Sequence, residues 1–202
     1  LSRQIGGNSI DAGFPIIAGI MGQGETVKWQ VEACERLFQE MGAGQIVHME
    51  DERYQIALKS LRSFPTGQAV SSDMMSGITC RASVTPEQIG NLYQLAEKRC
   101  QKSSMVCGML AHFSSGHMSF VFCQEVPFKE PHLDILAGVI NDLQQAAVES
   151  GGSLVVEHAP AALKSRVEVW GSARDNLPIM RMLKNKFDPK GILNNSRFIG
   201  GI

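Results

Sequence analysis

Residues 77–100 read GITCRASVTPEQIGNLYQLAEKRC, and this stretch decides the fold. Its first eight residues have the short, bounded pattern of a β-strand. Thr85 and Pro86 then mark the start of a helix, because proline is favoured at the first helical position and Glu87 and Gln88 suit a first turn. Apolar residues follow at helical spacing: Ile89, Leu92, Tyr93, Leu95 and Ala96. The stretch therefore predicts a strand that leads directly into an amphipathic helix.

The same rhythm continues to residue 158. Strands are predicted at residues 104–113, 117–124 and 153–157, and a long helix at residues 131–150. The resulting order is strand, helix, strand, strand, helix, strand, which is the split βαβ or ferredoxin-like pattern. We therefore predict an α+β fold, in which a ferredoxin-like antiparallel sheet carries helices on one face.

The residues before this unit suggest part of a second one. A strand is predicted at residues 14–22, a helix at 25–41, a strand at 45–49 and a helical piece near 51–63. We accordingly expect a duplicated or one-and-a-half ferredoxin-like unit, divided at about 14–70 and 77–158, with C-terminal helices and a tail over 159–202. Residues 1–13 are polar and Gly-rich, and we expect them to be a linker from a preceding domain.

Composition limits the class of protein. Hydrophobic residues make up 44% of the 202 residues and charged residues 19%, which is typical of a globular chain. The formal net charge of −1 argues against nucleic acid as a partner, because phosphates call for a basic face. The five cysteines form no CxxC pair, so we expect buried free thiols and a reducing, cytoplasmic location. No apolar run has the length of a membrane span.

The end of the chain, residues 186–202, reads KFDPKGILNNSRFIGGI. Apolar residues at helical spacing predict an amphipathic helix over residues 178–187. Asp188 and Pro189 end it, because a proline disfavours helical backbone at the residue before it. The residues beyond mix Gly, Asn and Ser with Ile, Leu and Phe without a period. We therefore expect this tail to be held against another part of the protein.

Residues 187–194, FDPKGILN, resemble the F-D-P-x-G-I-L-N-P-G signature of FAD-linked oxidases of the vanillyl-alcohol-oxidase type. The resemblance is greatest to the smaller FAD-binding subunit of glycolate oxidase. Asn195 and Ser196 stand where Pro and Gly are usual, whereas Asn194 and the basic Arg197 remain in register. The resemblance implies a C-terminal cap domain built from ferredoxin-like units, with FAD held mainly by an N-terminal domain. It also implies that Asn194 and Arg197 bind the cofactor.

Residues 111–119, AHFSSGHMS, resemble the family segment H-x-G-D-G-N-L-H, whose two histidines help bind a divalent metal in some 2-hydroxyacid dehydrogenases. His112 matches the first ligand, but Ser119 replaces the second and His117 falls on the neighbouring Asn. Because the ligand set is incomplete, we predict that no metal is bound, and we assign His112 and His117 to substrate binding. The alternative is a pair of strand-end histidines satisfied by backbone or water.

Residues 156–160, VEHAP, resemble the segment G-E-H-G-x-G, in which Glu is a metal ligand and His faces flavin and substrate. The resemblance implies catalytic roles for His158 and Glu157. A histidine at a strand end beside a carboxylate also suits acid/base work or the stabilisation of negative charge. Lys164, Arg166 and Arg197 are candidates for binding a substrate carboxylate.

Two hypotheses follow. The first is a cap domain of an FAD-dependent oxidoreductase that oxidises a small 2-hydroxy acid such as glycolate or D-lactate, with hydride transfer to flavin. Its partners would be the N-terminal FAD-binding domain and other glycolate oxidase subunits, including an iron-sulfur subunit, in the cytoplasm or peripherally at the inner face of the cell membrane. The isolated chain would be inactive. The second hypothesis is a free-standing ferredoxin-like module for ligand binding or oligomerisation, without enzymatic activity.

Overall fold

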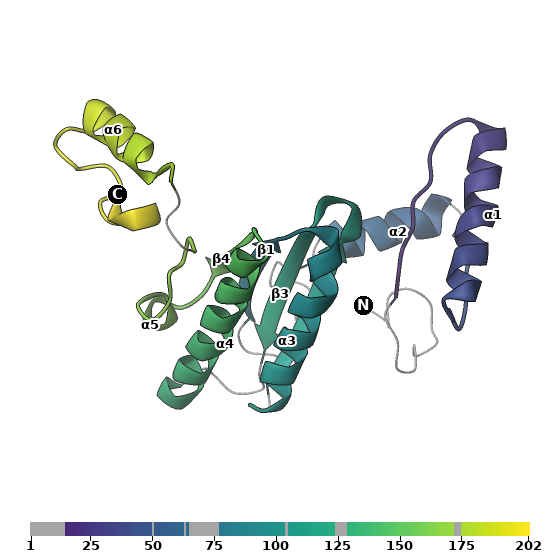
Figure 1. Cartoon of the computed structure of the whole chain (residues 1–202), viewed down its shortest axis with the longest axis horizontal. Helices are drawn as coiled ribbons and strands as arrows, with labels where there is room; N and C mark the ends of the chain where they lie inside the picture. The colour runs from purple at the N-terminus through teal and green to yellow at the C-terminus, as the bar shows by residue number, and fades with distance from the viewer. Residues whose placement is uncertain are drawn as a thin grey trace. The chain divides into compact units, whose positions relative to one another are not determined.

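The computed structural model describes residues 15–49, 51–62, 64, 77–103, 105–123, 129–171 and 175–202. The chain divides into two units, Leu1–Arg62 and Ser63–Ile202 (Figure 1). The predicted linker at residues 1–13 lies outside the described residues.

The first unit contains two helices, α1 at Gly24–Glu40 and α2 at Asp51–Arg62, close to the two helices predicted. The strands predicted at residues 14–22 and 45–49 are wrong, because no strand forms in the described residues of this unit. The apolar run there has no partner strand, and a lone strand leaves its backbone donors and acceptors unpaired. Ile16 and Met21 are accordingly 62% and 90% exposed. The described residues therefore contain one ferredoxin-like sheet and no second half-unit.

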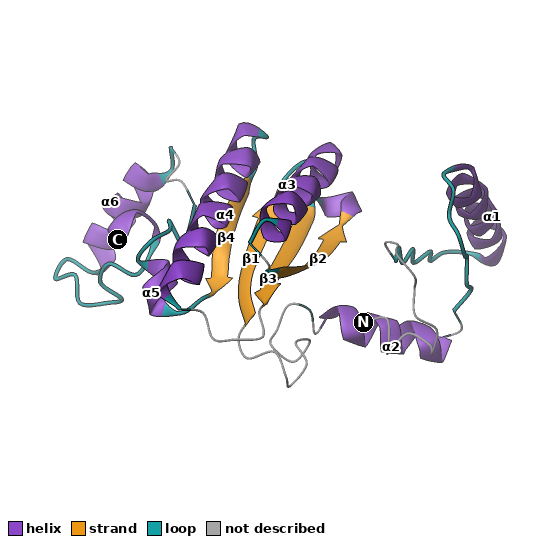
Figure 2. Cartoon of the chain, turned by 90° about the horizontal axis from the view of Figure 1, so that it is seen from below, coloured by secondary structure: helices purple, strands orange, loops and turns teal. Residues whose placement is uncertain are grey.

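The second unit has the predicted ferredoxin-like order. Its strands form one sheet in the order β2-β3-β1-β4, and every neighbouring pair is antiparallel (Figure 2). This confirms the α+β prediction. The elements are β1 at Gly77–Ser83, a 3-10 turn at Pro86–Gln88, α3 at Ile89–Gln101, β2 at Val106–His112, β3 at His117–Cys123, α4 at Glu130–Glu149 and β4 at Ser153–His158.

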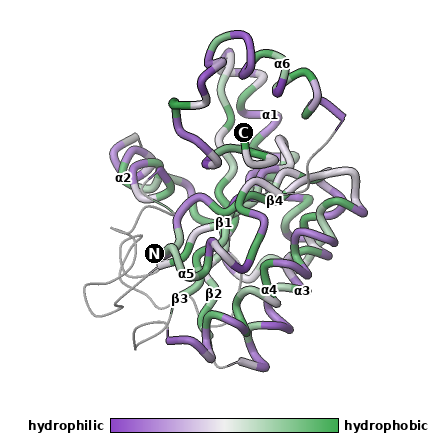
Figure 3. The backbone as a smooth tube through the Cα atoms, turned by 90° about the vertical axis from the view of Figure 1, so that its left-hand side faces the viewer, coloured by the Kyte–Doolittle hydropathy of each residue, from purple (hydrophilic) through white to green (hydrophobic). Residues whose placement is uncertain are grey.

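The core lies between the sheet and helices α3 and α4, which cover the same face (Figure 2). Met118, Phe120 and Phe122 alternate along β3 toward these helices and are at most 2% exposed, as the sequence predicted. Apolar and polar stretches alternate along α3 and α4, as expected for helices with one buried face (Figure 3). The other side of the sheet, here called the open face, carries no helix among the described residues of this unit.

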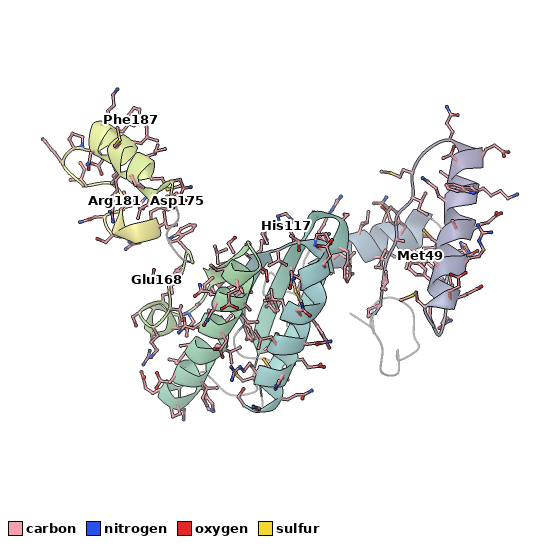
Figure 4. All side chains as sticks on the ribbon, in the orientation of Figure 1. Met49, His117, Glu168, Asp175, Arg181 and Phe187 are labelled. Carbon is pink, nitrogen blue, oxygen red and sulfur yellow. The ribbon has the colours of Figure 1, made fainter. Side chains whose placement is uncertain are left out.

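The C-terminal part begins with the short helix α5 at Ala161–Lys164 and continues to α6 at Leu177–Phe187 and a 3-10 turn at Ile199–Gly201. The helix α6 ends immediately before Asp188, as predicted. No residue of α6 is buried, and Ile179, Met182 and Phe187 are 62%, 71% and 78% exposed. Figure 4 shows Phe187 at the end of this helix. The helix predicted over residues 178–187 is thus confirmed, and these apolar side chains of it are largely exposed.

Candidate functional site

The sheet places the predicted site residues on its open face but at two different ends. His112 pairs with His117, and His117 pairs with Ser83 across the β3–β1 ladder. His158 instead pairs with Thr79, at the other end of β1. Ser83 lies four positions after Thr79 on β1, so the two histidine sites lie about 13 Å apart along the strand direction. The structure therefore brings His112 and His117 together and keeps them away from His158.

The histidine pair lies where β2 turns into β3 (Figure 4). Both side chains are exposed. Gly116 makes the turn with a φ of 67°, and its carbonyl accepts a hydrogen bond from Val84 N at 2.9 Å. A Cβ at this position would lie 1.9 Å from the carbonyl oxygen of Val84, so only glycine fits. Substrate binding by the pair stays a prediction.

Glu157 and His158 lie at the end of β4, where the ladder with β1 is irregular. Cys80 pairs with Val156 and Thr79 with His158, so Glu157 is the extra residue of a β-bulge. The bulge lets two consecutive residues approach the open face. Both are exposed, and their catalytic roles stay predictions.

Arg81 is a site candidate that the sequence analysis missed. Its Nε lies 3.0 Å from Glu157 Oε1 in an ion pair, and its side chain is 49% exposed. It pairs with Ser119 and Val155 in the middle of the sheet, so it points to the open face between the two histidine sites. The available signal was a single arginine within the otherwise uncharged strand GITCRAS. The arrangement is a guanidinium, a carboxylate and an imidazole on the open face.

The thiols are buried or partly buried, as expected from the sequence, and all five are free. Burial, followed by the nearby charge of Glu157, raises the pKa of Cys80 to about 12, so this thiol stays protonated at neutral pH. In the described part of the chain, no three His, Cys, Asp or Glu side chains gather in a way that could hold a metal ion.

The tail contains a compact polar network around Asp188. The side chain of Lys184, followed by the backbone amides of Leu193 and Ile192, holds the pKa of this carboxyl at about 2. Asn194 follows with a φ of 47° and lines a cavity of about 370 Å³. The other lining residues are Met180, Leu183, Lys184, Leu193, Phe198 and Ile202.

Arg197 and Arg166 differ in their surroundings. The carbonyl of Arg197 accepts a hydrogen bond from Trp170 Nε1 at 3.2 Å, which ties the tail to the segment after β4. The guanidinium of Arg166 contacts Glu130, and its Nε lies 2.9 Å from Asp134 Oδ1 on α4. Arg166 is therefore engaged in holding α4, whereas the side chain of Lys164 is exposed.

Comparison with known protein families gives a match over most of the chain. A family model described as "FAD linked oxidases, C-terminal domain" matches residues 6–197. None of the curated proteins searched matches the chain. Among the described helices, none is both long and apolar enough to cross a membrane.

Proposed function

Because the chain belongs to the family of C-terminal domains of FAD-linked oxidases, we propose that it is the cap domain of an enzyme that oxidises a small 2-hydroxy acid. Membership in the family implies FAD, an oxidoreductase reaction and an N-terminal FAD-binding domain as partner. The choice of a glycolate-like or D-lactate-like substrate is narrower, and it is supported by the segments around His112, His158 and Asn194.

The observation that carries the proposal is the group formed by Arg81, Glu157 and His158 on the open face. A guanidinium binds a carboxylate through paired, charge-assisted hydrogen bonds, which suits the carboxylate of a 2-hydroxy acid. Glu157 lies 3.0 Å from Arg81 Nε and so orients the guanidinium. His158 is close in sequence and shares the face, and an imidazole is suited to accepting the proton of the substrate hydroxyl.

Bound FAD would supply the hydride-accepting chemistry for this oxidation. The tail residues fit such a cofactor in their chemistry. Apolar side chains line the cavity beside Asn194, whose amide supplies both donors and an acceptor. Mostly apolar walls, with the Asn194 amide and the Lys184 side chain as polar groups, suit the edge of a flat heteroaromatic ring. We propose that His112 and His117 contact the substrate as it enters the site, because the β2–β3 turn that carries them lies on the open face.

The remaining parts of the proposal concern partners and location. We propose that the N-terminal FAD-binding domain faces the open face and the tail, and that the chain alone is inactive and binds flavin weakly. Other subunits of a glycolate oxidase assembly, including an iron-sulfur subunit, and a cytoplasmic or peripheral membrane location stay predictions.

The test uses the flavoprotein that contains this chain together with its FAD-binding domain. Its oxidised-flavin absorbance should be lost under anaerobic conditions when glycolate or D-lactate is added. Arg81→Met should raise KM for the 2-hydroxy acid about tenfold or more, because a charge-assisted contact to the substrate carboxylate is lost. His158→Asn should mainly lower kcat.

Arg99→Met is the matched control, since Arg99 is also a half-exposed arginine in an ion pair, 2.9 Å from Asp142. Both arginine variants should fold equally well. Equal effects of the two substitutions on KM would refute the role of Arg81. A flavin that no 2-hydroxy acid reduces would refute the proposed substrate class.

A further inference from the structure

The carboxylate of Asp188 is buried at the end of α6, although charged residues are seldom buried without partners. Two backbone amides of the following loop donate to it, Ile192 N to Oδ1 at 3.0 Å and Leu193 N to Oδ2 at 2.9 Å. Lys184 Nζ, one helical turn earlier, lies 2.7 Å from Oδ2. The carboxylate therefore ties the last turn of α6 to the loop that follows it.

Lys184 makes a second connection to the same loop. Its Nζ also donates to the carbonyl oxygen of Leu193. The peptide groups on both sides of Leu193 are thus held, the N–H by Asp188 and the C=O by Lys184. Gly191 N adds a turn contact to the carbonyl oxygen of Asp188 at 3.0 Å. These contacts fix the chain immediately before Asn194.

Asn194 has the left-handed backbone that side-chain-bearing residues rarely adopt, with a φ of 47°. Such a conformation persists where the surrounding structure determines it. Its carbonyl oxygen accepts a hydrogen bond from Arg197 N at 3.1 Å, which holds the chain on the C-terminal side of Asn194. Lys184 and Leu193 line the same cavity as Asn194. The residues that hold the loop are therefore part of the surface that Asn194 completes.

We propose that Asp188 and Lys184, here called the tail clamp, are positioning residues that hold the Asn194 side chain against the flavin. The inference rests on the proposed function, because it needs a flavin on this side of the tail. A carboxylate cannot cap the carbonyl groups at the C-terminal end of α6, because both groups are hydrogen-bond acceptors. The clamp instead holds Leu193 from both directions and so sets the backbone angle from which Asn194 projects.

The test combines substitutions of the clamp with one of Asn194 in the flavoprotein that contains the FAD-binding domain. Asp188→Asn keeps the side-chain shape but removes the charge and one acceptor. Asn194→Gly keeps the left-handed backbone and removes the amide. Asp175→Asn, at an exposed position before α6, is the matched control for loss of one negative charge. Lys184→Met serves as a second clamp variant if Asp188→Asn folds poorly.

Two measurements are made on each variant. Hydrogen exchange of the Ile192 and Leu193 amides should become about tenfold faster in Asp188→Asn and stay unchanged in Asp175→Asn. FAD affinity, measured by equilibrium dialysis with flavin fluorescence, should fall about tenfold in Asp188→Asn and in Asn194→Gly. The double variant should bind FAD no more weakly than Asn194→Gly, because the clamp acts through that side chain.

Multiplicative losses in the double variant would overturn the inference, since Asp188 would then act independently of Asn194. Faster amide exchange in Asp188→Asn with unchanged FAD affinity would also overturn the inference. If Asn194→Gly still weakened FAD binding, the proposed function would nevertheless stand. A wild-type protein that binds no FAD would refute the proposed function itself, and the inference with it.

Discussion

Replacing Gly116 by alanine should destabilise the second unit, whereas the same substitution at Gly138 should stabilise it. Gly116 has a φ of 67°, and an added Cβ would lie 1.9 Å from the backbone oxygen of Val84. A left-handed backbone costs alanine about 1–2 kcal/mol, and losing the Val84 N to Gly116 O hydrogen bond costs about 1 kcal/mol more. The expected loss in the free energy of unfolding is therefore about 2–3 kcal/mol.

Gly138 lies exposed within α4, where an added Cβ meets nothing within 4 Å. Alanine there should stabilise the unit by about 0.5–1 kcal/mol, because glycine is the poorer helix former. Urea unfolding followed by circular dichroism measures both variants. For a unit of this size, Gly116→Ala should lower Tm by roughly 5–10 °C. Shifts of the same sign and size in both variants would refute the turn geometry that carries His112 and His117.

Two further predictions concern the core and the tail. Phe120→Ala should lower the free energy of unfolding in urea by about 3–5 kcal/mol, because this ring is fully buried beside Phe122. Phe187 is 78% exposed, so Phe187→Ala should change the free energy of unfolding by less than about 0.5 kcal/mol. Asp188 should titrate near pH 2 by carboxyl NMR, against an ordinary 3.8, so its stabilisation of the loop is complete above pH 3.8 and is lost as the pH falls toward 2. An ordinary pKa for Asp188 would contradict the contacts with Lys184 and the two amides.

The sequence predicts the second unit well because its elements have both clear boundary residues and clear hydrophobic periodicity. The strand at 77–83 and the helix after Pro86 have clear boundaries, and β3 shows the alternation of Met118, Phe120 and Phe122. Residues 14–22 contain a similar apolar run, but a strand needs a partner that a local pattern cannot supply. The prediction of strands in the first unit was wrong because the local pattern does not show whether a partner strand is present.

The site was only partly predictable for the same physical reason. The motifs identify His112, Glu157 and His158 from neighbouring residues alone. Arg81 is separated from Glu157 by most of the second unit, and the two meet only because β1 and β4 are neighbours in the sheet. The sequence pattern identifies Asp188 only as the residue at which a helix ends. Its buried carboxylate and two amide contacts depend on the backbone path of the loop, which composition does not reveal.

The position of the tail depends on a connection that no motif contains. After β4 the chain returns along its edge, where Val156 N donates to Val169 O at 2.7 Å and Gln144 Nε2 donates to Glu168 O at 2.6 Å. Trp170, which follows Val169, then contacts the tail in two ways. Its ring centroid lies 4.8 Å from that of Phe198, and its indole N–H donates to the carbonyl oxygen of Arg197. Because β4 also carries His158, one strand and its return segment link the open face to the tail. A connection of this kind is what a cap domain needs if its proposed substrate and cofactor residues are to act on the same flavin.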